Sequence, residues 1–168
     1  MPGPVVDIDT LRALIEVLPG RRVVLTNGVF DLLHVGHLRY LRQARELGDV
    51  LVVGVNADTA VHKPGRPLVP DAERAELVAA LEPVDYVVIF AEATADGLLR
   101  AVRPDVYAKG ADYSAETLPE AATAREVGAR LVFLPLVPDR STTVLASARL
   151  PRPDSARGTC AGCSASAS

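Results

Sequence analysis

Residues 26–37 have the sequence Thr26-Asn27-Gly28-Val29-Phe30-Asp31-Leu32-Leu33-His34-Val35-Gly36-His37. A short apolar run precedes this stretch, and Leu38, Leu41 and Ala44 follow it at helical spacing, so the pattern predicts a buried strand, a turn and a helix. His34 and His37 then fall in or just before the first turn of the helix, and both rings can point at one ligand. Free backbone N–H groups and the positive end of the helix dipole lie there too. The stretch therefore predicts a phosphate site.

The same alternation of strand and helix continues along the chain. Strand-like apolar runs occupy residues 23–25, 50–55, 86–90, 106–108 and 131–134. Helices are predicted over residues 9–17, where Pro19-Gly20 ends the pattern, and over 71–81, with Asp71 as the cap. This order is typical of an α/β fold, and we expect a Rossmann-like, doubly wound, five-stranded parallel sheet with helices on both faces.

Length and composition predict one folded domain. The chain has 168 residues, of which 49% are hydrophobic, and this is enough for a single core. Beyond residue 150 the composition changes to Pro, Ser, Ala and Gly, which bury too little apolar surface to offset the entropy of ordering. We therefore expect a domain over residues 1–150 and a disordered low-complexity tail over 151–168. Cys160 and Cys163 lie in that tail and are too few for a structural zinc site.

Net charge and hydropathy limit the kinds of partner that the chain can bind. The chain carries 18 basic and 21 acidic side chains, a net charge of −3, and only 4% aromatic residues, so it lacks the basic field and stacking surfaces that hold nucleic acids. No apolar run approaches the roughly 18 residues needed to span a bilayer. The sequence predicts a cytoplasmic protein that binds small molecules, without a nucleic-acid or membrane partner.

Polar segments follow four of the five predicted strands. In sheets of this kind ligands bind outside the carboxyl ends of the strands. The segments are Thr26-Asn27-Gly28, Asn56-Ala57-Asp58, Lys109-Gly110-Ala111-Asp112-Tyr113 and Asp139-Arg140-Ser141-Thr142-Thr143. The chain has no Gly-x-Gly-x-x-Gly after the first strand and no Gly-Lys-Ser/Thr phosphate loop, which argues against a dinucleotide dehydrogenase and a P-loop NTPase. The histidine turn is left as the predicted phosphate site.

With these segments the chain resembles the His-x-Gly-His nucleotidyltransferases over about residues 11–145. It is most similar to the ADP-heptose synthase group, the adenylyltransferases that act on D-glycero-β-D-manno-heptose 1-phosphate. The resemblance implies the nucleotidylyl transferase fold, transfer of AMP from ATP to the heptose phosphate, a homodimer, and Mg²⁺ held mainly by phosphate oxygens and water.

The resemblance also implies site residues. The implied catalytic residues are His34, His37 and Lys63. Those implied to bind the nucleotide are Thr26, Asn27, Gly28, Phe30, Gly36, Lys109, Arg140, Ser141, Thr142 and Thr143. Those implied to bind the sugar phosphate are Asn56, Asp58, Arg66, Arg74, Asp112 and Tyr113. Metal ligands are not assigned.

Structural alternatives exist for several of these residues. The two histidines could cap a helix, residues 141–143 could cap the last helix, and His62, Lys63 and Arg66 could be solvated charge. Arg74 could be a surface residue paired with Asp71 or Glu73. Asp31 is expected to orient the turn through hydrogen bonds from backbone donors.

Two rival functions also stay open. One is a cytidylyltransferase acting on glycerol 3-phosphate or another polyol or sugar phosphate. The other is a non-catalytic nucleotide-binding module, because the basic loop over residues 61–67 is several residues shorter than its counterpart in the family.

Overall fold

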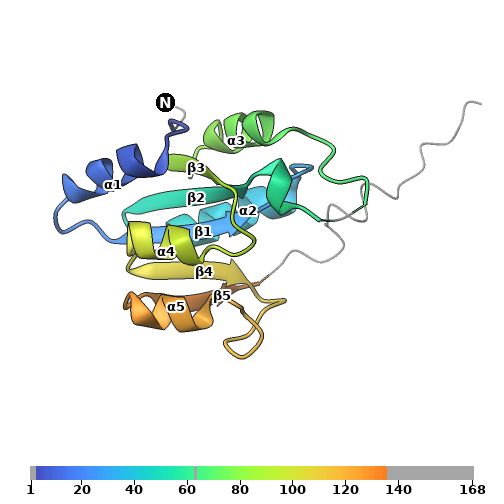
Figure 1. Cartoon of the computed structure of the whole chain (residues 1–168). Coiled ribbons are helices and arrows are strands. Elements are labelled where there is room, and N and C mark those ends of the chain that lie inside the picture. Colours follow the sequence, from blue (N-terminus) through green and yellow to red (C-terminus); the bar gives the residue numbers. More distant parts are fainter. Residues whose placement is uncertain (1–2, 63, 136–168) are drawn as a thin grey trace, which may run out of the picture.

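The computed structural model describes residues 3–62 and 64–135, and these build one parallel sheet with helices on both faces (Figure 1). The sheet has five strands in the order β3-β2-β1-β4-β5. Their bounds are β1 Val23–Gly28, β2 Val50–Asn56, β3 Tyr86–Phe90, β4 Val106–Gly110 and β5 Arg130–Leu134. The doubly wound α/β fold predicted from the sequence is confirmed.

The helices divide into two layers. Their bounds are α1 Ile8–Glu16, α2 Val35–Arg45, α3 Asp71–Ala79, α4 Asp96–Val102 and α5 Ala121–Glu126, with a short 3₁₀ helix η1 at Asp58–Ala60. One buried apolar cluster joins α1, α4 and α5 to the sheet, and a second joins α2 and α3 to the opposite face. In Figure 1, α4 lies in front of the sheet and α2 behind it.

The central strands are apolar on both faces, and this explains their uninterrupted hydrophobic sequence. Side chains alternate along a strand, so Val23 and Leu25 of β1 enter the cluster with α1, α4 and α5, whereas Val24 enters the cluster with α2 and α3. In β2, Val52 enters the cluster with α1, α4 and α5, and Val53 enters the cluster with α2 and α3. A strand covered on both faces needs apolar residues at every position.

The winding of the chain opens a crevice between the ends of β1 and β4. The strands β1, β2 and β3 follow one another toward one edge, and the chain then crosses to β4 on the other side of β1. The loop after β1 leads to α2 on one face, and the loop after β4 leads to α5 on the other. Loops that leave neighbouring strands toward opposite faces leave space for a ligand between them.

Several boundaries differ from those predicted. Strand β1 continues through Gly28 because Thr26, Asn27 and Gly28 pair with β2, so these residues belong to the strand and do not follow it. Lys109 and Gly110 likewise belong to β4 because they pair with β5.

The predicted cap of α3 is wrong. Pro70 occupies the N-cap position and Asp71 is the first helical residue. The Asp71 carboxylate instead accepts a hydrogen bond of 2.9 Å from the backbone N–H of Asp58. The helix ends at Ala79, two residues before the predicted limit at residue 81. Asp71 thus fixes the preceding loop.

Lys63, the segment with Arg140, Ser141, Thr142 and Thr143, and the tail with its two cysteines lie outside the described residues. Within the described residues, no helix has the length and apolar character needed to cross a membrane.

Tyr40 ties α2 to two strands. Its hydroxyl donates to the carbonyl oxygen of Ala108 in β4 at 3.0 Å and lies 2.7 Å from Oγ1 of Thr26 in β1. Burial raises the pKa of Tyr40 far above its ordinary value, so the hydroxyl keeps its proton.

We expect the substitution Tyr40→Phe to lower the free energy of unfolding by about 1–2 kcal/mol, because it leaves the buried Thr26 hydroxyl without its partner. Urea denaturation measures the change. The matched control is Tyr86→Phe in the edge strand β3, where the described residues make no hydrogen bond to the hydroxyl and the loss should stay below about 0.5 kcal/mol. Equal losses in the two variants would contradict this role for Tyr40.

Candidate functional site

A cleft of about 460 Å³ opens at the carboxyl ends of β1, β2 and β4. Backbone and side chains from both halves of the sheet line it. The lining residues are Asn27, Gly28, Val29, Phe30, His37, Tyr40, Asn56, Ala60, Val61, His62, Ala93, Thr94, Lys109, Gly110, Tyr113, Pro119 and Glu120. The cleft therefore lies at the crevice that the strand order creates.

His34 and His37 lie together at the start of α2. His34 is the N-cap residue, and its Nδ1 accepts the backbone N–H of Gly36 at 3.1 Å. Nδ1 of His37 accepts the backbone N–H of His34 at a longer 3.4 Å, which completes a reciprocal capping box. The ring centroids are 3.9 Å apart. The capping alternative is thus correct, and it is compatible with anion binding.

The capping bonds decide which ring nitrogens carry protons. A nitrogen that accepts a hydrogen bond carries no proton, so in the neutral ring the proton resides on Nε2. His37 can therefore offer an Nε2–H donor to the cleft that it lines. Burial, followed by repulsion from His34, lowers the pKa of His37 to about 4, so its ring is neutral at pH 7.

Phe30 packs beside His37 and also lines the cleft. Its backbone has φ +51°, in the left-handed region that residues other than glycine rarely adopt. The ring is buried, and its centroid lies 5.3 Å from that of His37. A Cβ on Gly28 would lie 3.2 Å from this ring, so glycine gives the ring room at the end of β1. The strained turn thus packs the aromatic ring beside the histidine.

Arg74 holds together three segments of the rim. Its side chain is fully buried, and Nε donates to the carbonyl oxygen of Val69 at 2.8 Å. Nη2 donates to the carbonyl oxygen of Asn56 at 2.9 Å and to Oδ1 of Asp58 at 2.6 Å, and Nη1 donates to the carbonyl oxygen of Val29. The surface alternative is wrong. The predicted role in substrate binding is corrected too, because every bonded nitrogen faces an internal acceptor.

Asp31 fastens the loop before α3 to the histidine turn. Its Oδ1 accepts the backbone N–H groups of Leu68 at 2.7 Å and Val69 at 3.1 Å, and its Oδ2 pairs with Nη1 of Arg66 at 2.5 Å. The expectation that Asp31 accepts bonds from backbone donors is confirmed. Arg66, predicted to bind substrate, forms an ion pair with this buried carboxylate through Nη1.

Lys109 lines the same cleft from the carboxyl end of β4. It is 8% exposed, and its Nζ donates to Oδ1 of Asn27 at 3.1 Å and lies 5.1 Å from the ring centroid of Tyr113. The Tyr107 hydroxyl donates to the same Asn27 oxygen at 2.6 Å. Burial lowers the pKa of Lys109, whereas the nearby charges of Glu120 and Asp112 raise it. A cation with little access to water therefore lies in the cleft.

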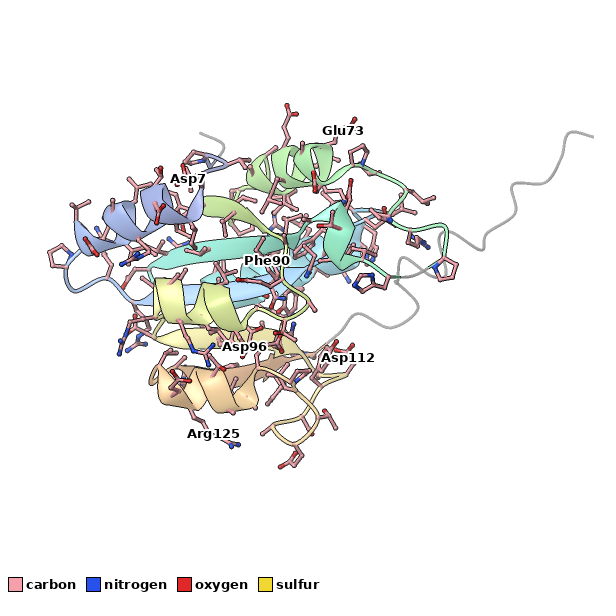
Figure 2. The ribbon with its side chains drawn as sticks, viewed as in Figure 1. Asp7, Glu73, Phe90, Asp96, Asp112 and Arg125 are labelled. Atoms are coloured by element: carbon pink, nitrogen blue, oxygen red, sulfur yellow. The ribbon has the colours of Figure 1, made fainter. Side chains whose placement is uncertain are left out.

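The structure brings part of the predicted site together. Asn27, Gly28, Phe30, His37, Asn56, Lys109 and Tyr113 line the cleft. Asp112 lies at the same end of the sheet, in the loop after β4 (Figure 2). Thr26 does not fit its prediction, because it is fully buried and its hydroxyl is bonded to Tyr40. The Asp58 carboxylate is paired with Arg74.

Sequence reasoning missed Tyr40, Thr94 and Glu120. Tyr40 lies three positions after His37 on α2 and so on the same side of the helix, a spacing that could have identified it. Thr94 and Glu120 lie in the connections before α4 and α5. Neither carries a recognisable spacing from the histidine turn, so only the fold brings them to the cleft.

Comparisons with known proteins agree with this geometry. The model of the cytidylyltransferase-like family matches residues 25–144. The chain is 46% identical over 140 residues to the bifunctional protein HldE of Syntrophotalea carbinolica, covering 80% of this chain and 29% of that protein. It is 48% identical over 129 residues to HldE of a Nitratiruptor species, covering 75% of this chain and 27% of that protein. The chain thus spans less than a third of the length of these curated relatives.

Solved structures share the fold. The lipopolysaccharide core biosynthesis protein of Thermoplasma volcanium is 30% identical with a TM-score of 0.58, covering 70% of this chain and 98% of that one. Pantoate-beta-alanine ligase of Francisella tularensis, at 14% identity, has a TM-score of 0.61 and covers 84% of this chain and 69% of its own. The ligase supports the architecture alone.

The buried guanidinium generates a stability prediction. We expect the substitution Arg74→Met to lower the free energy of unfolding by about 3 kcal/mol or more, because several acceptors around the fully buried guanidinium lose their donor together. Chemical denaturation measures this. The control is Arg42→Met, where the arginine side chain is 58% exposed and 3.8 Å from Glu82, and where the loss should stay below about 1 kcal/mol. Similar losses for both variants would overturn the role assigned to Arg74.

The titration of His37 generates a second prediction. Because its folded-state pKa of about 4 lies below the ordinary value of 6.5, the unfolded state binds more protons between these pH values. His37 therefore contributes stability that is fully present above pH 6.5 and is lost as the pH falls toward 4. Long-range ¹H–¹⁵N spectra, assigned with a His37→Asn variant, should show a neutral ring protonated on Nε2 at pH 6. A titration midpoint at or above 6.5 would contradict this prediction.

Proposed function

The chain belongs to the cytidylyltransferase-like family of nucleotidyltransferases, and from this we propose that it transfers AMP from ATP to D-glycero-β-D-manno-heptose 1-phosphate. The products would be ADP-heptose and pyrophosphate. The choice of heptose phosphate and ATP is supported by the segments shared with the ADP-heptose synthase group and by the identity of 43–48% to HldE proteins.

The observation that carries the proposal is the histidine pair. The two imidazoles, with ring centroids 3.9 Å apart, cap the start of α2 with Nδ1, and the Nε2–H group of His37 is then a donor beside the positive end of the helix dipole. His37 lines the cleft, as do Phe30 and Tyr40. Such fixed donors stabilise charge that grows on phosphate oxygens without having to reorient during the reaction.

The proposed reaction is a single in-line displacement. An oxygen of the sugar phosphate attacks the α-phosphorus of ATP, the new P–O bond forms, and the bond from the α-phosphorus to the α,β-bridging oxygen breaks. Pyrophosphate leaves with the electron pair. The attacking phosphate is already ionised at pH 7, so no general base is required. Catalysis then depends on holding the two phosphates in line and on stabilising the charge of the leaving group.

Residues outside the described part belong to the same proposal. We assign Lys63 to neutralising the phosphates, and Arg140, Ser141, Thr142 and Thr143 to binding the triphosphate. Among the described residues, no group of three His, Cys, Asp or Glu side chains could hold a metal ion. We propose that Mg²⁺ comes with the triphosphate and is held mainly by phosphate oxygens and water.

The proposal is tested by incubating the protein with Mg²⁺, each of ATP, CTP, GTP and UTP, and D-glycero-β-D-manno-heptose 1-phosphate. Pyrophosphate release and the mass of the nucleotide sugar are measured together. We expect ADP-heptose with ATP. Use of CTP alone would contradict the choice of nucleotide, and ATP binding without turnover on any sugar phosphate would support a non-catalytic module.

Two substitutions separate the capping role of His37 from its role toward phosphate. Asparagine places a polar atom near Nδ1, and glutamine places one near Nε2. We expect His37→Asn to keep α2 capped but to lower kcat by about 100-fold or more, because the donor toward phosphate is gone. His37→Gln should retain more activity than His37→Asn. Steady-state kinetics on variants with wild-type circular dichroism check this, and a fully active, folded His37→Asn protein would refute it.

A further inference from the structure

Glu120 is a buried carboxylate that the reaction proposed above does not use. It occupies the N-cap position of α5 and is only 5% exposed. Its Oε1 accepts the backbone N–H of Ala95, the N-cap residue of α4, at 3.1 Å. One oxygen therefore joins the connection before α5 to the connection before α4. Burying a carboxylate is costly unless its oxygens are satisfied, so the second oxygen needs an explanation.

The second oxygen of Glu120 has access to the cleft. Within residues 3–62 and 64–135, Oε2 accepts no hydrogen bond. In the same part of the chain, no buried polar side-chain atom lacks a partner, so Oε2 must be in contact with solvent. Glu120 lines the cleft together with Thr94 and Pro119. Because Glu120 lines the cleft and its Oε1 is bonded to Ala95, Oε2 is the oxygen that it can offer to a ligand there.

Lys109 provides a donor in the same cleft. Its Nζ donates to Oδ1 of Asn27, which leaves further N–H groups of the ammonium for another acceptor. Burial lowers the pKa of Lys109, and the negative charge of Glu120 opposes this effect, so the two charges attract one another across the cleft lining. Yet the described residues show no direct ion pair between them. The cleft lining thus offers both a donor and an acceptor to a ligand group that can accept and donate.

We propose that Glu120 is a substrate-binding residue that accepts a hydrogen bond from a hydroxyl group of the acceptor polyol phosphate, with Lys109 donating to the oxygen of that hydroxyl. A hydroxyl has one donor and two acceptor lone pairs, so it satisfies both groups at once. The inference rests on the proposed function, because it assumes that the cleft receives a sugar phosphate.

Part of the cleft lining suits a sugar. Asn27, Asn56, Thr94, Lys109 and Glu120 line the cleft together with apolar and aromatic residues, so hydrogen-bonding groups of both charges are available there. A polyol presents a hydroxyl on nearly every carbon and can bond to several such groups at once. Specificity for a hydroxyl is also strong where the protein groups that bind it are buried, because an analogue without the hydroxyl leaves them unpaired.

The experiment compares the wild-type protein with Glu120→Gln by calorimetry, using heptose 1-phosphate and a non-hydrolysable ATP analogue as separate ligands. The glutamine Oε1 can still accept the N–H of Ala95, but an NH₂ donor then faces the cleft in place of an acceptor. We expect the dissociation constant for heptose 1-phosphate to rise by about tenfold or more and that for the ATP analogue to change by less than about twofold. The control is Glu126→Gln on α5, an exposed carboxylate paired with Arg100.

Deoxy analogues of the acceptor identify the hydroxyl. One deoxy analogue should bind the wild-type protein about tenfold more weakly than the parent sugar phosphate, yet show little further loss in the Glu120→Gln variant. This non-additive result cannot come from a merely structural role of Glu120. Losses that add fully for every deoxy analogue would overturn the inference.

The remaining outcomes separate this inference from the proposed function. If the wild-type protein binds the ATP analogue and the sugar phosphate but the variant binds both as well as the wild type does, the inference fails and the function stands. If the variant weakens only the ATP analogue, Glu120 serves the nucleotide and the inference is overturned. If the wild-type protein binds the ATP analogue but no sugar phosphate, both the acceptor assignment and the inference fail.

Discussion

The buried guanidinium of Arg74 is the constraint on which the arrangement of the cleft depends. Its donors bond to the segment after β1, the segment after β2 and the loop before α3, so three connections from different parts of the chain share one fixed point. Asp31 also holds the loop before α3, because its carboxylate accepts backbone N–H groups of that loop. An arginine and an aspartate in the interior thus fix a rim that the sheet alone would leave free.

The two histidines cap α2, and the same hydrogen bonds determine which ring nitrogen carries the proton. Each imidazole uses Nδ1 to complete the start of α2, and in His37 this bond places the proton of the neutral ring on Nε2. The burial that lowers the pKa of His37 also keeps that form present at neutral pH. Phe30, held at φ +51°, packs against His37 and limits where its ring can lie. The residues that cap the helix are therefore the same residues that we propose to bind phosphate.

The fold was predictable from the sequence, whereas the polar network of the cleft was predictable only in part. Apolar runs alternating with helical patterns determine a doubly wound sheet, and the spacing of His34 and His37 gives their place on α2. Arg74 was misassigned because no local pattern distinguishes a buried arginine from a surface one: its acceptors at Val29, Asn56 and Val69 are backbone carbonyls. Glu120 was missed for a similar reason, since its bond to Ala95 joins two distant connections.

The manner in which Arg74 is bonded has a consequence for how this protein can diversify. Three of its four acceptors are main-chain carbonyl oxygens, which every amino acid supplies. Side chains along the rim can therefore be exchanged over generations without loosening the anchor, provided that the backbone keeps its path. Under this arrangement the side chains that face the cleft can change while the backbone frame that Arg74 holds is inherited unchanged.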